Sequence, residues 1–238
     1  MFVSIVINAD TRSGFLEDTT QQTGMFNGCR SLDFLIDGVQ NKINFFDGFE
    51  KEVILFVDEH QPIPEDAIGR IRGMVDTLVI HKHSKRYADQ IECHKFNDFN
   101  YVQALQLARG EYIAHFDQDC AAFKVNDSVI TQMIGLVNHH YDFVCYPSDA
   151  SPNPANDPTY DYFWASTRFF LCRREVLDFT EISKCLLDYE YTYTNYPASK
   201  KNHWLEHILG LISKYNNGSK VYYRVPYLAS YAIFCWDH

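Results

Sequence analysis

Residues 107–120, Leu-Ala-Arg-Gly-Glu-Tyr-Ile-Ala-His-Phe-Asp-Gln-Asp-Cys, indicate both the fold and the position of a candidate site. An amphipathic run ends at Gly110, and residues 111–115 have the composition of a β-strand. Two carboxylates, Asp117 and Asp119, follow where that strand should stop. Residues two apart in an extended chain face the same side, so both carboxylates can point at one centre. The segment predicts a site at the carboxyl end of a strand.

The Asp117/Asp119 pair has two interpretations. Hard divalent cations such as Mg²⁺ or Mn²⁺ bind to one or two carboxylates together with substrate phosphates and water. Aspartates after a strand also often cap a turn or the helix that follows. For an isolated Asp-x-Asp pair the capping role is the commoner one, so the surrounding sequence has to decide between the two.

Length and composition set the first limits. The chain has 238 residues, of which 46% are hydrophobic and 16% aromatic, enough for one large domain or two small ones with a full core. Its net charge of -10 argues against a nucleic-acid-binding surface, which would show clustered Lys and Arg. An acidic protein that handles phosphates needs a metal ion or a few well-placed bases.

The lack of a recognisable targeting signal and the distribution of the cysteines predict a cytoplasmic protein. No run approaches the roughly 20 apolar residues of a membrane span, so we expect no transmembrane segment. The first eight residues lack the basic region and the cleavage site of a signal peptide. The seven cysteines are odd in number and scattered, which favours buried free thiols in a reducing compartment over disulfides or zinc sites.

Strands and helices alternate in the first half of the chain, which predicts right-handed parallel crossovers. The sequence is therefore expected to form an α/β fold whose central, mostly parallel sheet is flanked by helices. Gly110 is expected to end the third helix in the left-handed conformation. The expected strands are residues 2–7, 52–57, 77–80 and 111–115, and the expected helices are residues 31–46, 64–75 and 97–109.

Polar residues follow the first strands and would line a crevice at their carboxyl ends. Asp10 can accept a hydrogen bond from a ribose hydroxyl or a base, and Arg12 can meet a pyrophosphate, although a solvated loop is an equal alternative. Asp58 ends the second strand on the same edge. The basic segment 81–86 is either a loop that closes over a diphosphate or a solvated face.

The second half of the chain is less regular. Four tyrosines between residues 189 and 196 suggest a surface that contacts something polar and flat. The expected elements are a helix from residue 126 or 127 to 137, a strand at 142–146, an aromatic strand and short helix within 162–175, a helix at 203–215 and a strand at 222–234.

Four segments, in this order along the chain, resemble the GT-A type glycosyltransferases. Within that type, the resemblance is closest to the large family 2 of nucleotide-sugar enzymes. They are Val3-Ser4-Ile5-Val6-Ile7, Val53-Ile54-Leu55-Phe56-Val57-Asp58-Glu59, residues 100–113 and Phe116-Asp117-Gln118-Asp119. The resemblance covers roughly residues 1–125. It favours metal and nucleotide binding, rather than capping, as the role of the Asp117/Asp119 pair. It implies a single GT-A domain over residues 1–238, with a nucleotide-binding half at 1–125 and an acceptor-side half at 126–238.

The resemblance implies a metal-dependent glycosyltransferase that moves a sugar from a nucleoside diphosphate-sugar to the hydroxyl of a glycan or another acceptor. Mn²⁺ or Mg²⁺ would be its cofactor. The implied metal ligands are Asp117, Asp119 and His238, and the implied nucleotide-sugar contacts are Asp10, Arg12, Asp58, Asp117 and Trp164.

The resemblance also implies roles for Glu206 and Trp164, and each of these two roles has an alternative. Glu206 stands where such enzymes place the base that deprotonates the acceptor hydroxyl, but it is followed by His207 where a second acid is usual, and an exposed helix charge is an equal interpretation. Trp164, with Tyr160 and Tyr162, resembles the aromatic wall of the sugar site, although aromatic stripes are more often core.

Departures from the family pattern leave other functions open. Asn8-Ala9-Asp10-Thr11 replaces the usual Pro-Thr-Tyr-Asn, and the Gln-x-x-Arg-Trp motif of processive polysaccharide synthases is absent. Sugar nucleotidyltransferases share the architecture, but their glycine-rich loop after the first strand is missing. A non-catalytic carbohydrate- or protein-binding domain of the same fold is the third alternative.

Overall fold

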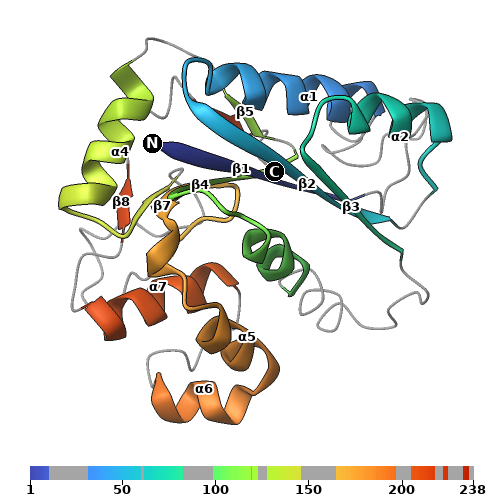
Figure 1. The fold of residues 1–238 in the computed structure, drawn as a ribbon. Helices are drawn as coiled ribbons and strands as arrows, with labels where there is room; N and C mark the ends of the chain where they lie inside the picture. The colour runs from blue at the N-terminus through green and yellow to red at the C-terminus, as the bar shows by residue number, and fades with distance from the viewer. Residues whose placement is uncertain are drawn as a thin grey trace.

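The computed structural model describes residues 1–10, 32–59, 62–82, 99–118, 120–122, 128–145, 165–196, 205–217, 222–224 and 233–235. In this part of the chain a seven-stranded sheet lies between two layers of helices (Figure 1). Its strands are β1 (Phe2–Asp10), β2 (Glu50–Glu59), β3 (Thr77–Lys82), β4 (Tyr112–Asp117), β6 (Phe143–Cys145), β7 (Phe169–Arg173) and β8 (Tyr222–Arg224).

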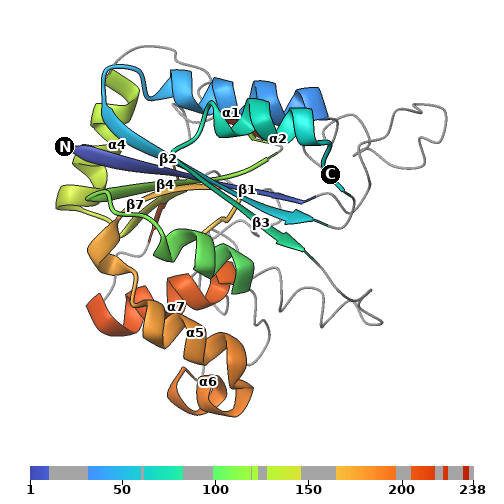
Figure 2. The ribbon, with the colours of Figure 1, turned by 45° about the vertical axis from the view of Figure 1, so that its right-hand side comes forward.

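The sheet is mostly parallel, as expected from the alternating elements. The strand order is β3-β2-β1-β4-β7-β6-β8. Only β7 runs against its neighbours β4 and β6, while the other described pairs are parallel. The carboxyl ends of β1, β2 and β3 therefore meet at one edge of the sheet, where Figure 2 shows their arrowheads together.

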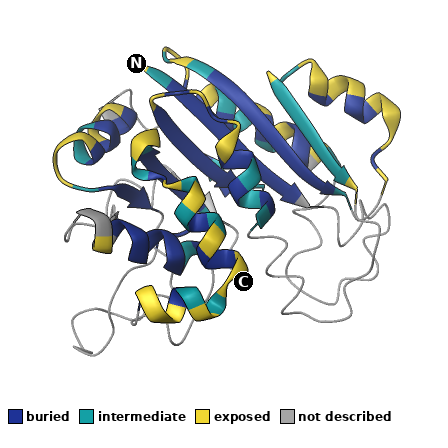
Figure 3. Cartoon of the chain, turned by 60° about the horizontal axis from the view of Figure 1, so that its bottom comes forward, coloured by how far each residue is buried: buried dark blue, intermediate teal, exposed yellow. Residues whose placement is uncertain are grey.

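Helices cover both faces of the sheet, and each layer has its own core (Figure 2). One face packs against α1 (Leu32–Phe45), α2 (Glu65–Arg72) and α4 (Ser128–His139). The other packs against the helix at 99–106, α5 (Phe179–Leu187) and α7 (Leu205–Asn217), with α6 (Tyr189–Asn195) outside them. Because helices lie on both sides, β1 and β2 are buried on both faces along most of their length (Figure 3).

Two short strands form a second sheet. β5 (Cys120–Ala122) pairs antiparallel with β9 (Ile233–Cys235). The sequence predicted one strand over 222–234, which is wrong: β8 joins the main sheet, β9 joins β5, and the residues between them lie outside the described part. The two strands have different partners, and a periodicity within one segment cannot reveal that.

Gly110 does not adopt the left-handed conformation; among the described glycines only Gly48 does so. A Cβ atom on Gly110 would lie 2.6 Å from the backbone nitrogen of Ser4 and 2.9 Å from the carbonyl oxygen of Phe2. The prediction of a left-handed helix stop is therefore wrong. Glycine is required here because the chain entering β4 passes directly against β1.

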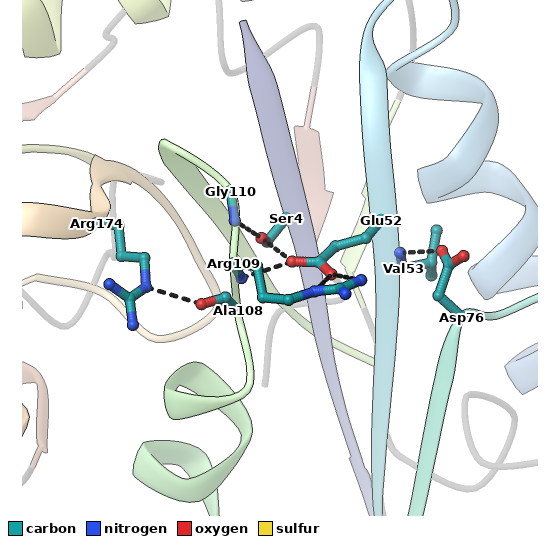
Figure 4. A network of polar contacts seen from close by, with 8 residues as sticks. All are labelled: Ser4, Glu52, Val53, Asp76, Ala108, Arg109, Gly110 and Arg174. Carbon is teal, nitrogen blue, oxygen red and sulfur yellow. Dashed lines mark hydrogen bonds and ion pairs between the residues drawn. The ribbon is translucent and has the colours of Figure 1, made fainter.

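A polar network at the amino-terminal edge of the sheet holds the start of β4 against β1 (Figure 4). The Gly110 N–H donates to Ser4 Oγ at 2.7 Å, and Ser4 Oγ donates to Glu52 Oε1 at 2.6 Å. The Arg109 guanidinium binds Glu52 Oε2 through Nε at 2.7 Å. Burial raises the pKa of Glu52, but the hydrogen bonds from Ser4 and Arg109 outweigh it and hold the pKa below its ordinary value. The network ties β1, β2 and the start of β4 together at the edge opposite the candidate site.

The tyrosine-rich segment 189–196 forms α6 and its end. Tyr191 and Tyr196 donate their hydroxyls to Glu181 Oε1 on α5 at 2.7 and 2.8 Å, and Tyr196 is buried. For these two residues the expected contact surface is wrong, because their hydroxyls hold α6 to α5.

In the described part of the chain no helix is long and apolar enough to cross a membrane.

Candidate functional site

Acidic residues end three neighbouring strands at the carboxyl edge of the sheet. In the ladder between β1 and β2, Asp10 lies opposite Asp58, and in the ladder between β1 and β4, Asn8 lies opposite Asp117. The structure thus brings together the register positions of three residues that the sequence put forward, Asp10, Asp58 and Asp117. Parallel strands separated widely in sequence produce this convergence, as expected for α/β folds.

The side chains of Asp58 and Asp117 face the layer that contains the helix at 99–106. Along a strand, alternate residues share a face, and Ile54, Phe56 and Ile113 belong to the core under that helix and α7. Asp58 is two residues beyond Phe56, and Asp117 is four beyond Ile113. Both carboxylates therefore lie on the same side of the sheet.

His81 extends this row onto β3. It lies opposite Asp58 in the ladder, and its Nδ1 is 3.3 Å from Asp58 Oδ1. The sequence placed His81 in a basic loop, whereas the structure ends β3 with His81 and Lys82; residues 83–86 lie outside the described part. Asp10, Asp58 and His81 are thus aligned across three strands, with Asp58 buried and His81 partly exposed.

Tyr101 restrains Asp117. Its hydroxyl donates to Asp117 Oδ1 at 2.5 Å, a charge-assisted hydrogen bond. The ring of Tyr101 packs on His115, with centroids 5.1 Å apart, and His115 stacks on Phe170 at 5.0 Å. Burial lowers the pKa of His115 to about 3, so its ring is neutral and acts as packing. Tyr101 is thus held in place by a buried ring stack and orients the carboxylate.

Asn8 lies beside Asp117 and is almost completely buried, at 5% exposure. Within the described residues neither its amide nitrogen nor its amide oxygen has a hydrogen-bond partner. Buried amides are nearly always paired, so such a group is a candidate contact for a ligand at the strand ends. The sequence analysis predicts a polar crevice at these strand ends but assigns no individual role to Asn8.

Glu206 lies in the first turn of α7 and is linked to the end of β4. Thr167 donates its hydroxyl to Glu206 Oε1 at 2.7 Å, and the next residue, Arg168, accepts a hydrogen bond from the Asp117 N–H at 2.9 Å. Burial raises the pKa of the Glu206 carboxyl, and the hydrogen bond from Thr167 only partly offsets this. The segment 165–168 therefore connects Glu206 and Asp117, and Glu206 is not a fully solvated helix charge.

Four other predicted site residues, Arg12, Asp119, Trp164 and His238, lie outside the described part, as do Tyr160 and Tyr162. Among the residues that the structure does describe, no three His, Cys, Asp or Glu side chains converge on a metal position. The partly exposed carboxylate of Asp117 is nevertheless the oxygen ligand that a hard divalent cation prefers. This donor chemistry fits the expected metal, and the rest of the ligand set stays a prediction.

Cys120 follows the Asp-x-Asp motif directly and is disulfide-bonded. The residue opposite it in the ladder of β5 and β9 is Cys235. The prediction of free thiols is wrong at Cys120, because pairing of two distant strands cannot be seen from cysteine spacing. Cys145, Cys172 and Cys185 are free and buried, as expected.

No protein-family model matches the sequence, and no curated protein matches it. Solved structures do match. TarS 1–349 from S. aureus has a TM-score of 0.51 at 13% identity, covering 94% of this chain and 58% of that one. A second structure of S. aureus TarS has a TM-score of 0.50 at 12% identity, covering 94% and 35%.

The mannosyltransferase PcManGT from Pyrobaculum calidifontis, in complex with GDP-Man and Mn²⁺, matches with a TM-score of 0.42 at 12% identity, covering 74% of this chain and 45% of that one. The chain thus spans roughly half the length of the solved structures it matches, or less. These likenesses concern the fold, which is the mixed α/β architecture expected from the sequence.

Proposed function

We propose that this chain, which has the GT-A fold that its sequence resembles, is a metal-dependent glycosyltransferase using a nucleoside diphosphate-sugar. The observation that carries the proposal is the alignment of Asp10, Asp58 and Asp117 at the carboxyl ends of three adjacent parallel strands. Ligands of open α/β sheets bind in the crevice outside these ends. A cytoplasmic location stays a prediction from the sequence.

The donor would lie across the ends of β1 and β2. We assign the nucleoside to Asp10 and Asp58, the pyrophosphate to Arg12, and the sugar to Trp164. TarS 1–349 is also known in complex with UDP-GlcNAc and with UDP, and PcManGT with GDP-Man and Mn²⁺. These ligands support a nucleoside diphosphate-sugar as the donor class, with uracil and guanine as the first bases to test.

Asp117 and Asp119 would hold the divalent cation, and His238 would complete its ligands. His238 is three residues beyond Cys235, which lies opposite Cys120 in the ladder of β5 and β9. Three residues span at most about 11 Å, so a metal ligand at position 238 is compatible with this pairing. A bound Mn²⁺ or Mg²⁺ would stabilise the negative charge on the departing diphosphate.

The acceptor hydroxyl, from a glycan or another molecule, would attack the anomeric carbon while the bond to the diphosphate breaks. Glu206 would take the hydroxyl proton if the reaction inverts the anomeric centre. A carboxylate whose pKa is raised by burial is a stronger base than a solvated one, and it is better matched to neutral pH. Thr167 would keep it oriented through its hydrogen bond.

Thermal-shift titrations with UDP, GDP, CMP and dTDP, each with and without Mn²⁺, test the proposal. We expect one nucleotide to stabilise the wild-type chain only when Mn²⁺ is present. Asp117→Asn and Asp119→Ala should abolish that shift. Asp33→Asn is the matched control, because Asp33 is a highly exposed acid on α1 whose ion pair is with Arg70.

If Asp33→Asn reduces the thermal shift as much as Asp117→Asn does, the assignment of the site is contradicted. Absence of any nucleotide shift, combined with metal-independent glycan binding, would support the non-catalytic carbohydrate-binding domain instead. Formation of a nucleotide-sugar from a sugar phosphate and a nucleoside triphosphate would support the nucleotidyltransferase.

A further inference from the structure

Lys42, in the last turn of α1, is completely buried, at 0% exposure. It lies three residues after Val39 and four before Phe46, within the apolar stripe that faces the sheet. Its ammonium lies over the Phe116 ring, 5.7 Å from the centroid. Burying an ammonium is costly unless it is well paired, so a helix that served only to pack would carry an apolar residue here.

The ammonium binds backbone at the candidate metal motif. Lys42 Nζ donates to the carbonyl oxygen of Gln118 at 3.4 Å and to that of Gly38 at 3.3 Å. Gln118 is the residue between Asp117 and Asp119. A lysine from the opposite face of the sheet therefore holds the peptide unit that joins the two carboxylates.

The neighbouring residue of α1 holds the other end of the same turn. Asn41 donates from Nδ2 to the carbonyl oxygen of Ala122 at 2.8 Å and accepts the Ala122 N–H at 2.7 Å. Asn41 and Lys42 thus bind the segment that leaves β4 at two points, residues 118 and 122. The short strand β5, which ends at Ala122, forms the second part of this segment and pairs with β9.

We propose that Lys42 is a positioning residue for the Asp-x-Asp motif. By fixing the Gln118 carbonyl, it sets the path of the chain that leaves Asp117 within the motif. Asp117 itself is restrained from the other side, by the Arg168 carbonyl and the Tyr101 hydroxyl. The consequence for metal affinity rests on the proposed function, whereas the restraint on the turn does not.

Hydrogen–deuterium exchange of Lys42→Met tests the restraint directly. Loss of a hydrogen bond from a charged donor should raise exchange in residues 117–122 by about tenfold, while residues 2–10 and 50–59 exchange as in the wild type. Lys51→Met is the matched control, because Lys51 Nζ also donates to a backbone carbonyl, that of Phe46, at 3.3 Å, away from the motif. Equal exchange of residues 117–122 in the two variants would overturn the inference.

Mn²⁺ affinity in the presence of the stabilising nucleotide, measured by electron paramagnetic resonance, gives the second readout. We expect Lys42→Met to weaken it about tenfold, Lys42→Arg to recover part of it, and Lys51→Met to leave it unchanged. If the wild type binds no Mn²⁺ but exchange in 117–122 still rises, the proposed function fails and the restraint stands. If Lys42→Met does not fold, Lys42→Gln, whose shorter amide is neutral, is judged by the same exchange criterion.

Discussion

Tyr101 and Asp117 illustrate how single residues shape the candidate site. The carboxylate comes from the end of β4 and the phenol from the helix at 99–106, which crosses above it. A phenol donating to a carboxylate fixes the rotamer of the acid before any ligand arrives. The buried stack of Tyr101 on His115 and Phe170 keeps the phenol from turning away.

Tyr101→Phe should weaken binding of the nucleotide with Mn²⁺ by about 5- to 20-fold, since a hydrogen bond to a charged group contributes about 1.5–3 kcal/mol and only part of it acts on the ligand. Isothermal titration calorimetry measures the effect. Tyr112→Phe is the matched control, because it removes another tyrosine hydroxyl at the opposite end of β4, one that donates to Asn138 at 2.9 Å. Equal losses in both variants would contradict a special role for Tyr101.

Glu206→Gln should lower turnover at least 100-fold, the usual contribution of a general base, and leave nucleotide binding unchanged. Because the folded-state pKa lies above the ordinary value of 4.5, the folded protein binds this proton more tightly than the unfolded chain does. The stability that the protonated group contributes is present below pH 4.5 and is lost as the pH rises through the raised pKa. Glu206→Gln should therefore be more stable than the wild type at pH 7 and lose its advantage in acid.

Turnover and urea unfolding across pH 4–8 measure both effects. Glu175→Gln is the control, since Glu175 is an exposed acid paired with Arg173 at 2.6 Å. Full turnover of Glu206→Gln at saturating donor would rule out the base.

The residues that the sequence identified and those that it missed differ in a physical way. Asp58 and Asp117 follow hydrophobic strands, and a strand end is visible in the order of residues. Tyr101, Asn8 and Lys42 acquire their roles from strand register and from a helix crossing, which bring together residues up to 109 positions apart. A lysine inside an apolar stripe was the signal available for Lys42.

At the scale of elements, β4 enters the sheet through a contact that tolerates only glycine. Gly110→Ala would place Cβ 2.6 Å from Ser4 N and 2.7 Å from Ser4 Oγ, distances that real Cβ atoms do not adopt. The strand or the Ser4–Glu52–Arg109 network has to shift. We expect the free energy of unfolding to fall by about 1–3 kcal/mol.

Gly69→Ala is the matched control for Gly110→Ala. Gly69 is exposed on α2, and a Cβ there meets nothing within 4 Å. Alanine is the better helix former, so this variant should gain up to about 1 kcal/mol. Urea unfolding of the two variants should therefore show opposite signs, and a stable Gly110→Ala would contradict the close approach.

Among the elements, those of the parallel half were predicted best. β1, β2 and β3, with α1 and α2 between them, follow from local hydrophobic patterns and short connections, and each is found within a few residues of its expected bounds. The antiparallel β7 and the separate partners of β8 and β9 depend on contacts across the whole chain. Their sequences are compatible with a strand but do not specify which strand lies beside it.

At the scale of the whole molecule, the last described strand returns to the middle of the chain. β9 pairs with β5, so residues 233–235 lie beside residues 120–122, directly after the Asp-x-Asp motif. The disulfide at Cys120 adds a covalent restraint at the same place. The fold thus brings residues 120–122 and 233–235 to the same position, although more than 100 residues separate them.

This arrangement makes a prediction for His238. If His238 completes the metal site, His238→Ala should weaken Mn²⁺ binding in the presence of nucleotide by about 10-fold or more, the scale of effect seen even for residues that only support metal ligands. His139→Ala, at the exposed end of α4, is the control. Unchanged Mn²⁺ affinity in His238→Ala would contradict the assignment of His238 as a metal ligand.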